Sequence, residues 1–181
     1  YNLKMFDKAQ QSCRSLLTNY PNCPYEMDAL ILMGDISLEQ GRTTNAFKHY
    51  INARPMIDDL LYLNVIDKRI YNCIGIGIKG EVIEGLLFRE KDSFNRSIIN
   101  LTRAYQAWLS GDSYELDMII NEIDTFHLPG YYSGIFGALK NAVQDPIKRP
   151  LTIAVILPLS GYEKEKGQAY LLGLSDYLKS N

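Results

Sequence analysis

Hydrophobic residues recur every three or four positions along most of the first 145 residues, and this is the period of an amphipathic helix. Proline and glycine residues interrupt the pattern at several points, where we expect helices to end. The pattern predicts helices over residues 6–17, 57–74, 81–90, 93–109, 114–126 and 131–143, in addition to a pair between 29 and 53. Residues 1–145 are therefore predicted to form an all-α domain.

The segment from Ala29 to Ala53 carries a more specific spacing of small and large residues. Gly34 and Ala46 stand where two antiparallel helices would cross, because small side chains let the backbones approach closely. Tyr50 would fill the space beside them, and Gly41 is placed to end the first helix with a positive φ angle. This spacing resembles the tetratricopeptide repeat.

The glycines also indicate a repeat period. Gly41 and Gly111 lie 70 residues apart, which is two periods of 35, and the cluster Gly75–Gly80 falls between them. Because tetratricopeptide repeats are about 34 residues long, the chain is predicted to contain about three and a half helix pairs. We expect these pairs to stack as an α-α superhelix, with the later repeats less regular than the first.

Stacked helix pairs of this kind present a concave surface to their partners. Tyr25, Asn45, His49 and Tyr50 combine aromatic area with hydrogen-bonding groups, and we expect them to contact a protein or peptide there. A solvated position on its helix remains the alternative for His49.

The character of the chain changes after residue 145. Residues 146–150 read as a linker, and 151–157 are a continuous apolar, β-prone run that is typical of a buried parallel strand. A helix is predicted over 166–178, so that 151–181 would be the first strand and helix of an incomplete α/β domain. Since a lone strand leaves its backbone groups unpaired, we expect 151–157 to pair with another chain, to pack on the helices or to belong to a longer protein.

The segment LTIAVILPLSGYEKEKGQAYLLGLSDYL, residues 151–178, resembles the start of type 1 periplasmic binding proteins. The shared features are the strand, the Pro-Leu-Ser-Gly loop and the helix beginning near Gly167. The penicillin-binding protein activator family joins a tetratricopeptide-like domain to such a domain, and residues 20–25 resemble a link between repeats in bacterial envelope proteins.

This resemblance implies a non-catalytic interaction or scaffold module in the bacterial periplasm or at the outer membrane, with a lipid anchor upstream of Tyr1. The alternative is the N-terminal region of a solute-binding protein of an ABC transporter. In either family Ser160 and Gly161 would contact a small amino-acid-like ligand once the α/β domain is complete.

Composition narrows the classes of partner. The formal net charge is -2 and 22% of the residues are charged, which gives no basic footprint for nucleic acid. No apolar run approaches the roughly 20 residues of a membrane span. The odd number of cysteines, Cys13, Cys23 and Cys73, excludes full pairing within one chain, although a Cys13–Cys23 bridge stays open in an oxidising compartment.

Motifs with catalytic or cofactor chemistry are weak. Gly75–Gly80 matches G-x-G-x-x-G, but a helical pattern precedes it, so we interpret it as a turn between helices and not as a dinucleotide site. His49 and His127 have no metal-ligand spacing around them. Asp112 and Glu115 fit a helix cap, and the other acidic groups fit solvated helix faces. We therefore expect no enzyme activity, cofactor or metal.

Overall fold

The computed structural model describes residues 3–144 and 164–180, and the chain divides into two compact units, 1–149 and 150–181. Within the described ranges every regular element is a helix, which confirms the all-α prediction at this level. The second unit is represented in these ranges by α9 (Lys164–Ser180), close to the helix predicted from the sequence.

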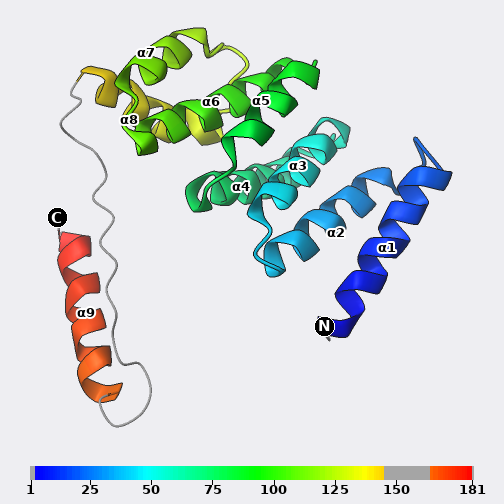
Figure 1. Ribbon diagram of the computed structural model, residues 1–181, viewed down its shortest axis with the longest axis horizontal. Coiled ribbons are helices and arrows are strands. Elements are labelled where there is room, and N and C mark those ends of the chain that lie inside the picture. The colour runs from blue at the N-terminus through cyan, green and yellow to red at the C-terminus, as the bar shows by residue number, and fades with distance from the viewer. Residues whose placement is uncertain (1–2, 145–163, 181) are drawn as a thin grey trace. The chain divides into compact units, whose positions relative to one another are not determined.

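The helices of the first unit follow one another as an array (Figure 1). Its elements are α1 (Leu3–Asn19), α2 (Glu26–Glu39), α3 (Thr43–Ala53), the 3-10 helix η1 (Arg54–Met56), α4 (Leu60–Ile76), α5 (Gly80–Arg89), α6 (Ser93–Ser110), α7 (Ser113–Glu122), the 3-10 helix η2 (Gly130–Tyr132) and α8 (Ser133–Gln144). The successive pairs α2–α3, α4–α5 and α6–α7 start 34 and 33 residues apart.

The turns at Gly41 and Gly111 end α2 and α6 in the same way. Both glycines have a positive φ angle, 69° and 76°. In each turn the glycine N–H donates to the carbonyl three residues earlier, and the next N–H donates to the carbonyl five residues before it. This pair of hydrogen bonds defines the Schellman motif, which favours glycine. The predicted helix ends at these two glycines are therefore confirmed.

The start of α4 differs from the sequence prediction. The periodic pattern begins at residue 57, whereas the helix begins at Leu60. The carboxylate of Asp59 accepts hydrogen bonds from the N–H groups of Leu61 and Tyr62, at 2.7 and 3.1 Å. Because these donors have no carbonyl partner within the helix, Asp59 fixes the first turn.

The end of α7 also differs from the prediction, which extended the helix to residue 126. Asp112 caps its start as expected, by accepting the N–H of Glu115 at 2.9 Å. The helix stops at Glu122. Two residues later, Asp124 accepts the N–H of Phe126 at 3.0 Å, and this local hydrogen bond stabilises a turn in place of a further helical turn.

Helices adjacent in the chain pack against each other with one exception. Contacts join α1 to α2, α2 to α3 and α3 to α4, and they join α5 to α6, α6 to α7 and α7 to α8. The pair α4–α5 is not among the extensively packed pairs, and its two helices are connected by residues 77–79. The array thus consists of two packed halves, α1–α4 and α5–α8.

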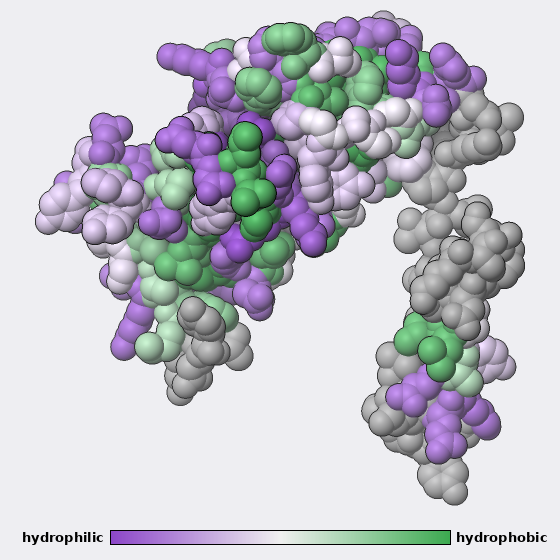
Figure 2. Space-filling view, turned by 180° about the vertical axis from the view of Figure 1, so that it is seen from behind, coloured by the Kyte–Doolittle hydropathy of each residue, from purple (hydrophilic) through white to green (hydrophobic). Residues whose placement is uncertain are grey.

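One hydrophobic cluster runs through both halves. It contains buried aliphatic residues from α4 and α6, such as Ile66 and Ile70 on the first helix and Ile98 and Leu101 on the second. A smaller cluster holds α1 against α2. Figure 2 shows the exposed apolar residues on one face as separate groups among hydrophilic ones, so no continuous apolar band covers that face.

The three cysteines are free thiols in the structure. Cys13 and Cys73 are buried as small hydrophobic side chains, and Cys23 is half-buried. Burial raises the pKa of the Cys73 thiol to about 12, which keeps it protonated and unreactive at neutral pH.

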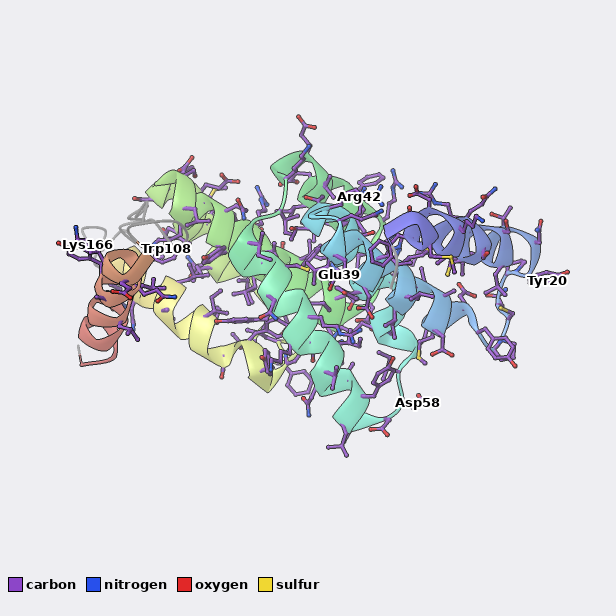
Figure 3. All side chains as sticks on the ribbon, turned by 90° about the horizontal axis from the view of Figure 1, so that it is seen from below. Tyr20, Glu39, Arg42, Asp58, Trp108 and Lys166 are labelled. Carbon is purple, nitrogen blue, oxygen red and sulfur yellow. The ribbon has the colours of Figure 1, made fainter. Side chains whose placement is uncertain are left out.

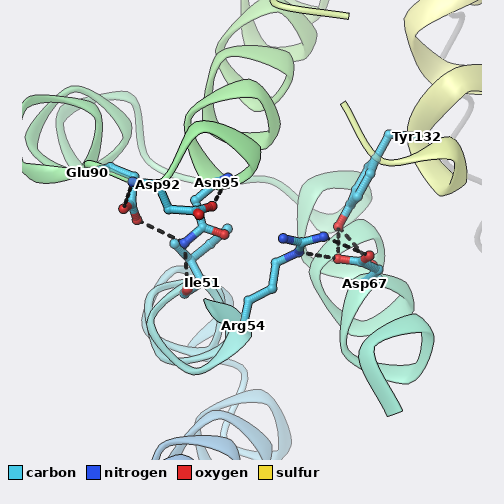
Figure 4. Close-up of polar contacts among 7 residues, drawn as sticks. All are labelled: Ile51, Arg54, Asp67, Glu90, Asp92, Asn95 and Tyr132. Carbon is cyan, nitrogen blue, oxygen red and sulfur yellow. Dashed lines mark hydrogen bonds and ion pairs between the residues drawn. The ribbon is translucent and has the colours of Figure 1, made fainter. Parts of the chain in front are cut away.

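Polar side chains tie the two halves together inside the core (Figure 4). Arg54 Nε and Nη2 donate to the two carboxylate oxygens of Asp67 at 2.7 and 3.3 Å. The hydroxyl of Tyr132 donates to the same carboxylate at 3.2 Å. Burial, followed by the charge of Asp67, raises the pKa of Tyr132, so the hydroxyl remains a donor. This network connects η1 and α4 of the first half to η2 of the second.

Gly34→Ala should lower the free energy of unfolding by about 1–3 kcal/mol, the usual range for overpacking a core. A Cβ at Gly34 would overlap with Cε1 of Tyr50, whose ring is fully buried. Urea denaturation gives the measurement. Gly85→Ala is the matched control, because Gly85 lies inside a helix with nothing within 4 Å of its Cβ position. It should raise stability by about 0.5–1 kcal/mol; equal effects of both substitutions would contradict the close crossing of α2 and α3.

Asp67→Asn should reduce the free energy of unfolding by about 3–5 kcal/mol, because it leaves the Arg54 charge buried without a full counter-charge. The double variant Arg54→Met with Asp67→Leu should recover much of that loss, and a double-mutant cycle in urea measures the difference.

The control for this cycle is the partly exposed ion pair of Arg69 with Asp35, 2.8 Å long with side chains 33% and 40% exposed. Arg69→Met should cost about 1 kcal/mol or less. Equal costs for the buried and the exposed pair would show that the buried network does not hold the halves together.

Candidate functional site

A groove of about 720 Å³ lies between the start of α3 and the connection from α4 to α5. We call it the basic groove; it is lined by residues 41–45 on one side and by residues 76–79 with Val82 on the other. The N–H of Lys79 donates to Thr44 Oγ1 at 3.4 Å and joins the two sides. These two residues are 35 positions apart, so the groove is built from two successive helix pairs, α2–α3 and α4–α5.

The side chains of Arg42 and Lys79 give the groove its charge. The Arg42 guanidinium donates to Gln10 Oε1 at 3.2 Å and to Gln40 Oε1, which orients it without neutralising it. None of the ion pairs in the described part of the chain involves Arg42 or Lys79. Both cations are exposed and therefore available to an anionic group.

His49 reports the positive potential beside the groove. Burial lowers its pKa first, and the charges of Arg14, Lys48 and Arg42 lower it further. Neither Arg14 nor Lys48 belongs to an ion pair in the ranges that the structure describes. Several cations thus gather around one face of α3 on a protein whose net charge is -2.

One of the four residues predicted to contact a partner lines this groove, and a second lies on the same helix. Asn45 is exposed and lines the basic groove. His49 lies one helical turn further along α3 and is half-buried. A contact between these residues and a partner stays a prediction.

Tyr50 was wrongly predicted as a partner-contacting residue. Its side chain is 0% exposed, and its hydroxyl donates to Asp35 Oδ1 at 2.7 Å. The guanidinium of Arg69 lies 5.8 Å from the centre of its ring. Burial and the hydrogen bond to Asp35 raise the pKa of Tyr50. Its full burial beside Gly34 confirms the predicted role of Tyr50 as a packing residue between helices.

Tyr25 is exposed but lies at the other end of the α2–α3 pair, since it directly precedes α2 while Asn45 lies in the first turn of α3. Figure 3 shows the same separation: Tyr20, in the link before α2, is well away from Arg42. The structure therefore does not bring Tyr25 together with Asn45 and His49.

The sequence analysis missed Arg42 and Lys79. Lys79 belongs to the Gly75–Gly80 cluster, which the structure confirms as a turn between helices, with helix α4 continuing to Ile76. Gly77 has a φ of 113° there, a conformation that favours glycine. The local sequence carries no signal that sets these two cations apart from the other basic residues of the chain.

The predicted ligand residues Ser160 and Gly161, and the predicted strand 151–157, lie outside the described residues. Among the described residues, no group of three or more His, Cys, Asp or Glu side chains is arranged to hold a metal ion. The helices within those ranges include none that is long and apolar enough to span a bilayer.

Comparison with protein-family models, with curated proteins and with solved structures gives no match to this chain.

Acidification should weaken the fold through His49. Its pKa is lowered from 6.5 in the folded protein, so the neutral form is favoured there. The favoured neutral form of His49 contributes its full stability above the pKa that His49 has in the unfolded chain. This contribution is lost as the pH falls below that unfolded pKa toward the lower pKa of the folded protein. Between about pH 7.5 and pH 5, urea unfolding should show a smaller loss in the free energy of unfolding for His49→Gln than for the unmodified chain. An equal loss in the two proteins would contradict the assignment to His49.

Proposed function

We propose that this chain is a non-catalytic helical-repeat interaction module and that its basic groove binds an acidic segment of a partner protein. The observation that carries the proposal is a groove of about 720 Å³ lined by Arg42 and Lys79, neither of which has a carboxylate partner among the described residues. Complementary charge across an interface favours encounter and selects the partner.

We further propose that the helix pairs stack as tetratricopeptide-like repeats, and their spacing supports this. The helix pairs start 34 and 33 residues apart, and the turns at Gly41 and Gly111 use the same hydrogen bonds. Repeats of this class offer extended surfaces between neighbouring units, and the basic groove lies between two such units. The connection of α4 to α5 departs from regular stacking and contributes one wall of the groove.

The wider role that we propose is the N-terminal part of a cell-envelope protein of the penicillin-binding protein activator type, located in the periplasm or at the outer membrane of a bacterium. The support is the resemblance of residues 151–178 to type 1 periplasmic binding proteins, following a helical unit. In this arrangement the helical unit holds a protein partner and the α/β domain carries the ligand site.

Charge reversal in the groove tests the proposal. A short fluorescent peptide in which Glu alternates with Gly should bind the chain saturably and more weakly at high salt. The double variant Arg42→Glu with Lys79→Glu should weaken binding more than about tenfold, because two cations that face the peptide become repulsive. Fluorescence anisotropy gives the measurement.

The control has the same change in net charge at exposed lysines elsewhere, Lys68→Glu with Lys140→Glu. Equal weakening by both double variants would mean that the overall charge, and not the groove, attracts the peptide. A second readout is the pKa of His49, followed by NMR. It should rise when carboxylates of the bound peptide oppose the charges of Arg14, Lys48 and Arg42 that lower it.

A further inference from the structure

A second groove, of about 380 Å³, opens at the other end of the α2–α3 pair. We call it the acidic groove. Its polar wall is formed by Glu26 at the start of α2, Asn52 near the end of α3, Glu90 before α6 and Asn95 in the first turn of α6. The groove therefore draws on both packed halves of the array.

The two carboxylates of the acidic groove are held in place by N–H groups. Glu26 accepts the N–H of Asn22 at 2.8 Å. Glu90 Oε1 accepts the N–H groups of Lys91 and Asp92, at 2.8 and 2.9 Å. None of the ion pairs within the described ranges includes Glu26 or Glu90.

Asn95 places an unused acceptor behind this wall (Figure 4). The residue is 0% exposed, and its Nδ2 donates to the carbonyl of Ile51 and to Glu90 Oε2, each at 2.9 Å. Because both of these neighbours are acceptors, the orientation of the amide is fixed and the remaining atom is the oxygen. Asn95 Oδ1 accepts no hydrogen bond from the described residues. A buried acceptor without a donor is unusual in a folded protein and costs stability.

We propose that the acidic groove binds the protonated amine or guanidinium group of a ligand. The site offers two carboxylates, and besides the already donating Asn95 the amide of Asn52 is the one side-chain donor among its lining residues. This excess of acceptors suits a group that carries several N–H donors and a positive charge. The apolar side chains of Leu17, Leu30 and Met56 line the same groove and would pack against the alkyl chain that bears the group.

A metal ion fits the groove less well. Its wall has two carboxylates and no histidine or cysteine, and the described residues include no cluster of three or more such ligands. The chemistry is shared by lysine or arginine side chains of a peptide and by free amines, so the experiment separates these sources.

The test is a titration of the full chain, labelled with nitrogen-15, followed by NMR. The resonances to follow are the Asn95 side-chain amide and the backbone amides of Glu26 and Glu90. Butylammonium chloride should shift them saturably, whereas tetramethylammonium chloride, with the same charge and no N–H group, should not. A blocked Gly-Lys-Gly peptide that binds more tightly than butylammonium would identify a peptide side chain as the ligand; equal or weaker binding would identify a free amine.

Glu26→Gln removes one charge while keeping an oxygen for the N–H of Asn22, and it should weaken butylammonium binding about tenfold. Glu39→Gln is the matched control, because Glu39 is an exposed acid at the opposite end of α2. Circular dichroism checks that both variants retain the fold.

Three results would overturn the proposal: no saturable shift with either amine probe, an equal shift with tetramethylammonium, or equal weakening by the two glutamine variants. The site is independent of the basic groove, so Arg42→Glu with Lys79→Glu should leave butylammonium binding unchanged. Loss of amine binding and loss of acidic-peptide binding are therefore separate outcomes.

Discussion

The buried ion pair of Arg54 and Asp67, with the hydroxyl of Tyr132, is the interaction on which the rest of the array depends. Consecutive helices pack against each other everywhere in the array except at α4 and α5. At that point the polar network supplies a specific connection between the halves, alongside the shared hydrophobic cluster. Removing two charges from water is expensive, and the geometry here offsets it with two contacts from Arg54 and one from Tyr132.

The two grooves lie at opposite ends of α3, and their charges oppose the dipole of that helix. Arg42 and Lys79 lie near its N-terminus, where the partial charge is positive, and Glu26 and Glu90 lie beside the groove at its other end, where it is negative. The antiparallel helix α2 offsets this, because Glu26 lies in its first turn and Arg42 follows its C-terminus, where its dipole favours these charges. The assignment of binding therefore rests on the charges that have no partner of opposite sign among the described residues.

Local signals in the sequence predicted much of the fold. Apolar periodicity placed the helices, Gly41 and Gly111 marked two turns, and Gly34 with Tyr50 marked a close crossing. The same pairing already implied a buried ring, so assigning Tyr50 to a partner surface conflicted with its packing role. The irregular pair proved to be α4–α5 and not the last one, whose turn repeats the first.

The sites themselves could not be read from the sequence, because they depend on which charges remain unpaired after folding. Nothing in the local sequence distinguishes Arg42 from Arg54, yet one is exposed without a counter-charge and the other is buried against Asp67. Asn95 appears as an ordinary residue of a helix start. It is buried because the fold brings it to the carbonyl of Ile51, 44 positions away in the chain, to which its Nδ2 donates.

The weak packing between α4 and α5 gives the array a seam. Each groove has one wall on α3 or its neighbours and the other at or beyond this seam, so an occupant touches both sides. A ligand in either groove would contact both halves, and its binding free energy would stabilise their association. The association of the two halves would then be weakest when both grooves are empty and strongest when both are occupied.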